Sequence, residues 1–293
     1  LAVKQGETVG LVGESGCGKS TVARIAAGLH APDGGAVRVE GGSGRLDVQM
    51  VFQNPMASLD PRQRIGKALA EAPLHHGLIR RAEQATFVAD MLRAVEMDPA
   101  MANRFPHAFS GGQRQRIAIA RALAVSPKIM ICDEAVSALD VSVASRILTL
   151  LRKLQAERGL GLLFISHDLE VVRSLCDRVI VMYLGRVVEE GPTARIFSAP
   201  RHPYTRLLLS SILPLDERMP FETEAAPDLP DPKAPPLGCP FHRRCPEALP
   251  QCGRDEPMLR RDGPDAIACH LNSGEGMRLQ GVRGMTDQSS RDT

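Results

Sequence analysis

The chain has 293 residues, of which 43% are hydrophobic and 24% charged, a composition typical of a folded globular protein and too apolar for general disorder. Lysine and arginine total 36 against 34 acidic residues, so the formal charge is +2 and no nucleic-acid partner is implied. The longest apolar runs, at 159–165 and 179–184, fall well short of the roughly 20 residues of a membrane span.

The chain opens at Leu1 rather than at a methionine, so we expect its natural N-terminus to lie upstream. No basic and apolar leader is visible, and Cys17, Cys132 and Cys176 occur singly in the first 200 residues. This usage is typical of a reducing compartment, and we expect a cytosolic protein.

Strand and helix patterns alternate along the first 200 residues. An apolar, β-branched run at 8–13 precedes a glycine-rich turn and a helical pattern at 19–29. The same alternation continues, with strands expected at 129–132, 162–165 and 178–183 and helices at 113–125, 143–157 and 168–175. It predicts an α/β fold with a largely parallel sheet covered on both faces.

Other regions depart from this alternation. Glycines flank a strand pattern between 34 and 44, which predicts a short antiparallel ribbon. Residues 61–104 are mostly helical in pattern, and we expect Pro73 and Pro99 to act as breaks. Residues 201–271 predict a proline-rich linker and a small irregular cysteine module, and residues 272–293 a disordered tail.

The segment GESGCGKS at 13–20 fits the phosphate-binding loop pattern G-x-x-x-x-G-K-[ST] between a predicted strand and a predicted helix. Backbone N–H groups of such a loop face the phosphates, Lys19 reaches the terminal phosphates, and the Ser20 hydroxyl ligates Mg²⁺. The residues expected to bind the nucleotide are Gly13, Glu14, Ser15, Gly16, Cys17, Gly18, Lys19, Ser20 and Thr21.

A later apolar strand ends in two carboxylates, Asp133 and Glu134. Asp133 can hold the magnesium shell while Glu134 aligns and deprotonates an attacking water. An apolar run that ends in two acidic residues is weak evidence by itself. Together with the phosphate-binding loop, it indicates a nucleotide hydrolase.

The segment FSGGQRQ at 109–115 narrows the family. Its serine can cap the following helix, its two glycines permit close backbone approach, and the helix N-terminus can face a phosphate. With this segment the chain resembles the ATP-binding subunit of an ABC transporter. The family signature corresponds to Ser110, Gly111, Gly112 and Gln113.

This resemblance covers residues 1–200 and implies an ABC-type P-loop ATPase domain, with a mainly parallel core, a short antiparallel subdomain and a helical subdomain at about 61–126. It implies that the signature acts in trans on the nucleotide of a second ATPase subunit. Asp140 matches the D-loop at that dimer interface. The matching catalytic residues are Gln53 of the Q-loop, Glu134 and the switch histidine His167, and the matching Mg²⁺ ligands are Ser20, Gln53 and Asp133.

Three segments, 54–62, 140–143 and HPYT at 202–205, resemble the ATPases of oligopeptide and dipeptide importers. Nickel and glutathione importers share these features, so the cargo stays open. The resemblance implies ATP-driven dimer closure that powers import, with two membrane permease subunits and an identical or paralogous ATPase as partners. It also implies an extracellular solute-binding protein as an indirect partner and a peripheral place at the cytoplasmic face of the membrane.

Four cysteines in the C-terminal module follow the spacing C-x5-C-x6-C-x16-C. Four thiols in a short segment of a cytosolic protein indicate a metal centre more than disulfides, and the absence of C-x2-C pairs favours an iron–sulfur cluster over zinc. The resemblance implies a [4Fe–4S] cluster, while zinc and unmetallated thiols remain alternatives. The expected ligands are Cys239, Cys245, Cys252 and Cys269.

The sequence departs from the family pattern in three places. Two strands and an adenine-stacking aromatic residue of the family would lie upstream of Leu1, the stretch from His30 to Gln53 is short, and Ala135 stands where proline is common. Two rival functions remain: a soluble accessory ATPase of an enzyme complex, of the carbon–phosphorus lyase type, and a non-catalytic nucleotide-binding scaffold. The cysteine module argues against the first, and the intact catalytic residues argue against the second.

Overall fold

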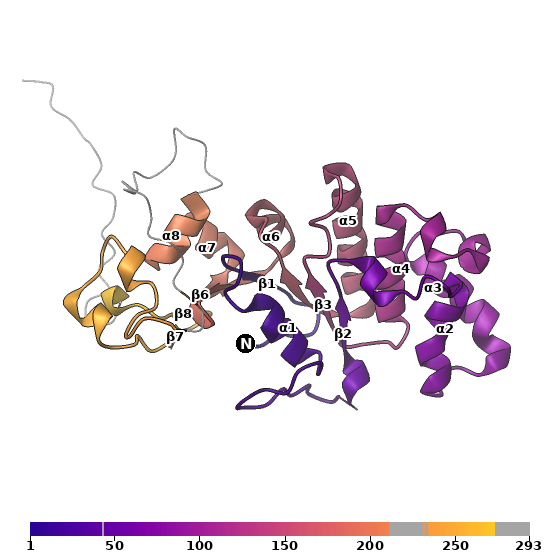
Figure 1. Cartoon of the computed structure of the whole chain (residues 1–293), viewed down its shortest axis with the longest axis horizontal. Coiled ribbons are helices and arrows are strands. Elements are labelled where there is room, and N and C mark those ends of the chain that lie inside the picture. The colour runs from indigo at the N-terminus through magenta and orange to yellow at the C-terminus, as the bar shows by residue number, and fades with distance from the viewer. Residues whose placement is uncertain (43, 211–230, 232–233, 273–293) are drawn as a thin grey trace, which may run out of the picture.

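The computed structural model describes residues 1–42, 44–210, 231 and 234–272, and its centre is one eight-stranded sheet (Figure 1). The strand order is β2-β3-β4-β1-β5-β6-β8-β7. Five neighbouring strands run parallel, namely β2 (Val48–Val51), β3 (Ile129–Asp133), β4 (Gly161–Ile165), β1 (Thr8–Val12) and β5 (Arg178–Tyr183). The expected parallel core is therefore present.

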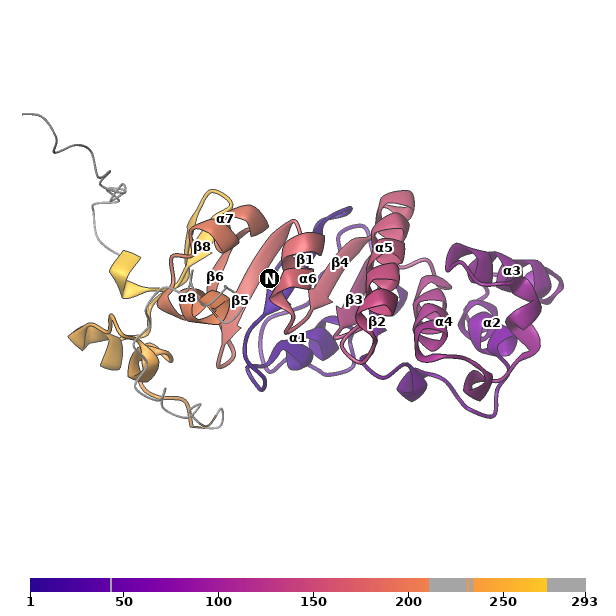
Figure 2. The same cartoon turned by 90° about the horizontal axis from the view of Figure 1, so that it is seen from above.

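Helices cover both faces of this core. In Figures 1 and 2, α1 (Lys19–Ala26) lies on one face, and α5 (Val141–Arg158) and α6 (Leu169–Leu175) lie on the other. Successive strand residues point to opposite faces, so Ile131 packs in the cluster of α1, whereas Met130 and Cys132 pack in the larger cluster of α5 and α6. Both clusters are buried, which is why these strands read as continuous apolar runs.

A helical region adjoins the β2 end of the sheet and contains α2 (Ile65–His75), α3 (Gln84–Ala94) and α4 (Gly111–Leu123) (Figure 1). The expected break at Pro73 is wrong, because α2 continues two residues beyond it. A proline in a helix lacks one backbone N–H donor, and Pro73 lies in the last turn of α2, where that loss is tolerated. Its carbonyl still accepts a hydrogen bond from Leu78 N at 2.8 Å. Pro99 instead begins a short 3₁₀ turn at Pro99–Asn103.

The predicted antiparallel ribbon at 34–44 is also wrong, since the described residues 34–42 and 44 contain no strand. Val37 is half exposed, so this segment buries no apolar face against which two short strands could be stabilised. Antiparallel pairing comes from the other end of the sheet, where β6 (Arg186–Pro192) pairs with β5 and with β8 (Asp265–Ile267), and β8 with β7 (Arg260–Asp262).

The C-terminal module is thus joined to the sheet rather than separate from it. Glu189 and Glu190 of β6 pair with Ile267 and Ala266 of β8. Two helices, α7 (Thr193–Ser198) and α8 (Pro203–Ser210), follow β6 (Figures 1 and 2). Most of the expected linker, at 211–230 and 232–233, and the expected tail from 273 lie outside the described residues.

A buried carboxylate organises this end of the fold. Glu189, with 0% exposure, accepts from the Arg195 guanidinium and from the backbone N–H groups of Arg201 and His202, both at 2.9 Å. Arg195 also donates to Asp265 of β8 at 2.9 Å. Burial lowers the pKa of His202 to about 4, so its ring is neutral and Nδ1 can accept from Tyr204 N at 3.0 Å.

We predict that Glu189→Ala lowers the free energy of unfolding by about 3 kcal/mol, because it removes the acceptor of a partly buried guanidinium and of two backbone N–H groups at a fully buried position. Thermal melting of the purified chain measures the loss. Asp90→Ala removes an exposed ion pair with Arg93 and is the control, with no measurable change expected. Equal melting temperatures for the two variants would contradict the structural role of Glu189.

Candidate functional site

The phosphate-binding loop follows β1 and begins with a glycine that no other residue can replace. Gly13 has φ +153°, and a Cβ there would overlap the Met182 carbonyl oxygen of β5. Gly16 and Gly18 also have left-handed backbones, with φ of +80° and +101°. Glycine adopts these conformations without strain, so the loop can turn tightly and lead directly into α1.

Lys19 is buried across this loop. Its Nζ donates to the carbonyl oxygens of Gly13 at 2.7 Å and Glu14 at 2.9 Å, and Cys17 Sγ lies 3.7 Å away. An ammonium has three donors, so the weakly engaged third one is available to a phosphate oxygen. Burial raises the pKa of the Cys17 thiol, which makes Cys17 a neutral packing residue of the loop.

The end of β3 lies against the start of α1. Ser20 Oγ donates to Asp133 Oδ1 at 3.2 Å, so a hydroxyl and a carboxylate converge there. Both are hard oxygen donors of the kind that Mg²⁺ prefers, and the pair fits the expected magnesium site. Burial raises the pKa of Asp133 against the lowering effect of the Ser20 hydrogen bond, and a bound cation would oppose that rise.

Glu134 is the meeting point of three segments. Gln53 Nε2, from the loop after β2, donates to Glu134 Oε2 at 2.9 Å, and His167 Nδ1, from the loop after β4, lies 3.5 Å from Oε1. The backbone of Glu134 has φ +49°, an uncommon value for a non-glycine residue, and its N–H donates to Ile165 O at 2.9 Å. Strained backbone of this kind clusters at functional sites.

The sequence assigned no role to Ser137, which lies three residues before the D-loop aspartate Asp140. Its Oγ accepts from Gln53 Nε2 at 3.3 Å and donates to Glu134 O at 3.0 Å. Ser137 therefore holds the glutamine and the glutamate together.

The signature segment forms a helix cap of its own. Ser110 Oγ accepts from Gln113 N at 3.3 Å, and Gln113 Oε1 accepts from Ser110 N at 3.0 Å, which confirms the expected capping by Ser110. A Cβ on Gly112 would overlap Val143 of α5, so this glycine permits close packing of α4 and α5. Within the described part of the chain, no hydrogen bond joins this segment to the phosphate-binding loop.

Asp140 precedes α5, and its carbonyl accepts from the N–H groups of Val143 and Ala144 at 2.9 and 2.8 Å. The next residue, Val141, is 88% exposed although it is apolar. The start of α5 therefore exposes a hydrophobic side chain to solvent in the single chain.

The four cysteines of the C-terminal module lie near one another but do not form a ligand set. Cys239 N donates to Cys252 O at 2.8 Å, and burial, with smaller effects of the Cys252 and Cys269 thiols, raises the pKa of Cys239 to about 11. Among the residues that the structure describes, no three His, Cys, Asp or Glu side chains are placed to hold a metal ion. The geometry therefore gives no support to the expected [4Fe–4S] cluster.

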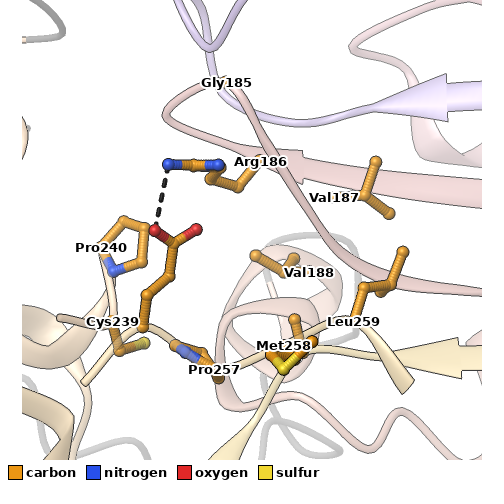
Figure 3. A pocket seen from close by; sticks show the side chains of 11 residues that line it. Gly185, Arg186, Val187, Val188, Cys239, Pro240, Pro257, Met258 and Leu259 are labelled. Atoms are coloured by element: carbon orange, nitrogen blue, oxygen red, sulfur yellow. Dashed lines mark hydrogen bonds and ion pairs between the residues drawn. The ribbon is translucent and has the colours of Figure 1, made fainter.

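A pocket of about 570 Å³ lies between β6 and this module (Figure 3). Val188, Cys239 and Met258 contribute to its lining, and an ion pair of 3.0 Å joins Arg186 to Glu256 beside them. Its lining comes from residues 185–188, 239–240, 256–259 and 268, none of which belongs to the predicted nucleotide site.

Comparison with known proteins gives two family matches. The ABC transporter family matches residues 1–137, and the C-terminal region of oligopeptide/dipeptide transporters matches residues 188–252. The oligopeptide transport ATP-binding protein OppF of Escherichia coli is 46% identical over 286 residues, which cover 92% of this chain and 85% of OppF. The di/tripeptide transport ATP-binding protein DppF of Pseudomonas aeruginosa is 45% identical over 92% of this chain and 87% of DppF.

A solved structure agrees with these matches. It is cbiO1 of Clostridium perfringens, part of the ABC transporter complex cbiONQ, with a TM-score of 0.60 and 27% identity over 68% of this chain and 82% of cbiO1. The chain therefore belongs to the ATP-binding proteins of ABC transporters, in the oligopeptide and dipeptide group, and is an ABC-type ATPase. In the part of the chain that the structure covers, no helix is long and apolar enough to cross a membrane.

We predict that Gly13→Ala weakens ATP binding roughly ten- to hundredfold, because its Cβ would displace the loop from β5 and strain the backbone. Equilibrium binding of labelled ATP to the purified chain measures the change. Gly35→Ala is the matched control, since Gly35 also has a positive φ, +79°, but meets no atom within 4 Å. Equal affinities for the two variants would show that contact with β5 is unimportant.

Proposed function

We propose that this chain hydrolyses ATP to power the import of peptides of the oligopeptide and dipeptide class across the cytoplasmic membrane. The observation that carries the proposal is the convergence of Ser20, Gln53, Asp133, Glu134 and His167 at the mouth of the phosphate-binding loop. The peptide cargo is supported by the names of the relatives and by the match of the C-terminal region.

Each residue of this convergence has a role in the proposal. Backbone N–H groups from Gly13 to Thr21 and the Lys19 ammonium bind the phosphates. Ser20, Asp133 and Gln53 hold Mg²⁺, which when bound neutralises charge on the phosphate oxygens. Glu134 accepts a proton from the attacking water, while His167 donates a hydrogen bond to the γ-phosphate.

A second ATPase subunit completes the site in this proposal. Ser110, Gly111, Gly112 and Gln113 would face the nucleotide of the partner, and Asp140 would lie at the dimer interface. Support comes from the exposed apolar Val141 beside Asp140 and from a signature segment that bonds within itself. Closure of the dimer on ATP would drive two membrane permease subunits, with an extracellular solute-binding protein delivering the peptide and the ATPase peripheral at the cytoplasmic face.

The two rival functions receive less support. Relatives that align over 92% of this chain at 45% and 46% identity are named as transport proteins, which disfavours a soluble accessory ATPase of the carbon–phosphorus lyase type. A non-catalytic scaffold would not need Glu134 held by both Gln53 and His167.

We predict that Glu134→Gln lowers ATP turnover of the assembled transporter by roughly 10²-fold, because the amide cannot accept the proton of the attacking water. ATP binding should persist, since Glu134 lies outside the phosphate-binding loop. Steady-state ATPase assays measure the loss, and Glu157→Gln, at an exposed position of α5, is the control with unchanged activity. Normal turnover by Glu134→Gln would remove Glu134 from the role of base.

For the C-terminal module we propose a [4Fe–4S] cluster held by Cys239, Cys245, Cys252 and Cys269. Support comes from the donor chemistry of four thiols in one short module, in which Cys239 N donates to Cys252 O at 2.8 Å. The described positions of these thiols would have to shift to ligate it. No step of hydrolysis passes through this cluster.

Anaerobic affinity purification from solubilised membranes tests partners and cluster together. We predict two permease subunits and a second ATPase among the co-purifying proteins, and about four irons with acid-labile sulfide per chain. Cys252→Ser should lose the iron, whereas Cys176→Ser, in the ATPase core, should retain it. Soluble enzymes as sole partners would overturn the importer, and zinc or metal-free thiols would overturn the cluster alone.

A further inference from the structure

Two residues of the C-terminal part of the chain form hydrogen bonds with Glu14 of the phosphate-binding loop. We propose that Tyr204 and Arg244 act as positioning residues that pre-form this loop and thereby raise the affinity for ATP, a role that rests on the proposed ATP hydrolysis. Tyr204 lies 190 residues and Arg244 230 residues from Glu14. Neither residue has a role in the reaction described above.

Every polar group of Glu14 has a partner. Its backbone N–H donates to the Tyr204 hydroxyl at 2.9 Å, and its carbonyl accepts from Lys19 Nζ at 2.9 Å. Its carboxylate receives two parallel bonds from Arg244, Nη1 to Oε2 at 2.8 Å and Nη2 to Oε1 at 3.0 Å. A bidentate pair of this kind fixes orientation as well as distance, so Glu14 is held in one geometry.

The Arg244 side chain is itself held in place. It is 9% exposed, and its guanidinium carbon lies 5.8 Å from the ring centre of Tyr183 and 5.9 Å from that of Phe241. The rings of Tyr183, Tyr204 and Phe241 pack on one another with centroid distances between 4.6 and 5.4 Å. Burial against aromatic faces strengthens the pair with Glu14 compared with an exposed ion pair.

The segment His202-Pro203-Tyr204 orients the Tyr204 side chain toward the phosphate-binding loop. The neutral His202 ring accepts from Tyr204 N at 3.0 Å, and buried Glu189 accepts from His202 N at 2.9 Å. Tyr204 is only 1% exposed, so its hydroxyl has little freedom to turn away from Glu14. This segment therefore connects the buried charge network of β6 to the phosphate-binding loop.

A loop with three left-handed glycines has many conformations to lose when it wraps around phosphates. The contacts at Glu14 restrict the start of the loop before ATP arrives, and Lys19 ties its end to the same residue. Pre-organisation reduces the entropy lost on binding and so raises affinity. The contacts of Glu134 with Gln53 and His167 do not involve these residues, so the rate of hydrolysis at saturating ATP should not depend on them.

Arg244→Met and Tyr204→Phe in the assembled transporter test this role. We expect the KM for ATP to rise roughly tenfold for Arg244→Met and severalfold for Tyr204→Phe, with kcat within about twofold of wild type. Arg244→Lys, which keeps the charge but not both bonds, should lie between Arg244→Met and wild type. Glu14→Gln provides the same test from the other side of the pair if Arg244→Met does not fold.

Arg206→Met is the matched control. Arg206 of α8 also forms an ion pair with the C-terminal module, with Glu247 at 2.8 Å, but it does not contact the phosphate-binding loop. Its KM should stay at the wild-type value. If Arg244→Met raises KM no more than Arg206→Met, or lowers kcat alone, the positioning role is wrong.

Equilibrium binding of labelled ATP to the purified full chain separates this inference from the proposed function. A wild-type transporter without ATPase activity would overturn the proposed function, yet weaker ATP binding by Arg244→Met than by Arg206→Met would still support the positioning role. Equal binding by wild type, Arg244→Met and Tyr204→Phe would overturn the positioning role whatever the activity.

Discussion

The close approach of the phosphate-binding loop to the end of β5 is the constraint on which the rest of the structure depends. Gly13 touches the Met182 carbonyl so closely that no side chain fits between them, and Gly185 N–H donates to Cys17 O at 2.9 Å just after β5. The loop is therefore braced by the strand that leads, through β6, into the C-terminal module. Gly10 of β1 permits a separate close contact, because a Cβ there would lie 2.8 Å from Val172 of α6.

Strand order explains how residues far apart in the sequence meet at one site. The strands β2, β3, β4 and β1 are neighbours and run parallel, so their carboxyl ends lie along one edge of the sheet. Gln53 follows β2, Asp133 ends β3 with Glu134 next, His167 follows β4, and the phosphate-binding loop follows β1. Ligand sites of open α/β sheets form at this edge, because the connecting loops gather there. The constellation around Glu134 is thus a consequence of topology, with the fine positioning left to Ser137 and to the unusual backbone at Glu134.

The parallel core could be predicted because its strands are buried on both faces and its helices carry strong periodicity, as in Ile129–Asp133 and Val141–Arg158. The local sequence pattern gave a wrong prediction at two places. The segment around Val37 alternates like a strand, but Val37 is half exposed and the segment has no apolar surface to pack against. Pro73 does not end α2, because it lies in the last turn of the helix. The pairing of Glu189 with Ile267, and the contacts of Glu14 with Tyr204 and Arg244, join segments more than 75 residues apart. No local spacing carries that information, although the HPY segment marked the region where it lies.

The way the C-terminal module is attached explains why a few buried charges matter there. The module buries few large apolar side chains, Phe241 being the main one, while Leu237 and Met258 are more than 80% exposed. Its ion pairs differ widely in exposure: the Arg186 and Glu256 side chains are 60% and 49% exposed, whereas the Arg244 side chain is 9% exposed. Exposed pairs contribute little to stability and are screened by salt, so they cannot fix the position of the module. Besides the pairing of β6 with β8, two buried charge contacts hold the module: the network of Glu189 with Arg195, and the pair of Arg244 with Glu14. The second of these ends on the loop that receives the phosphates. The same contact that holds the module in place therefore also shapes the nucleotide site.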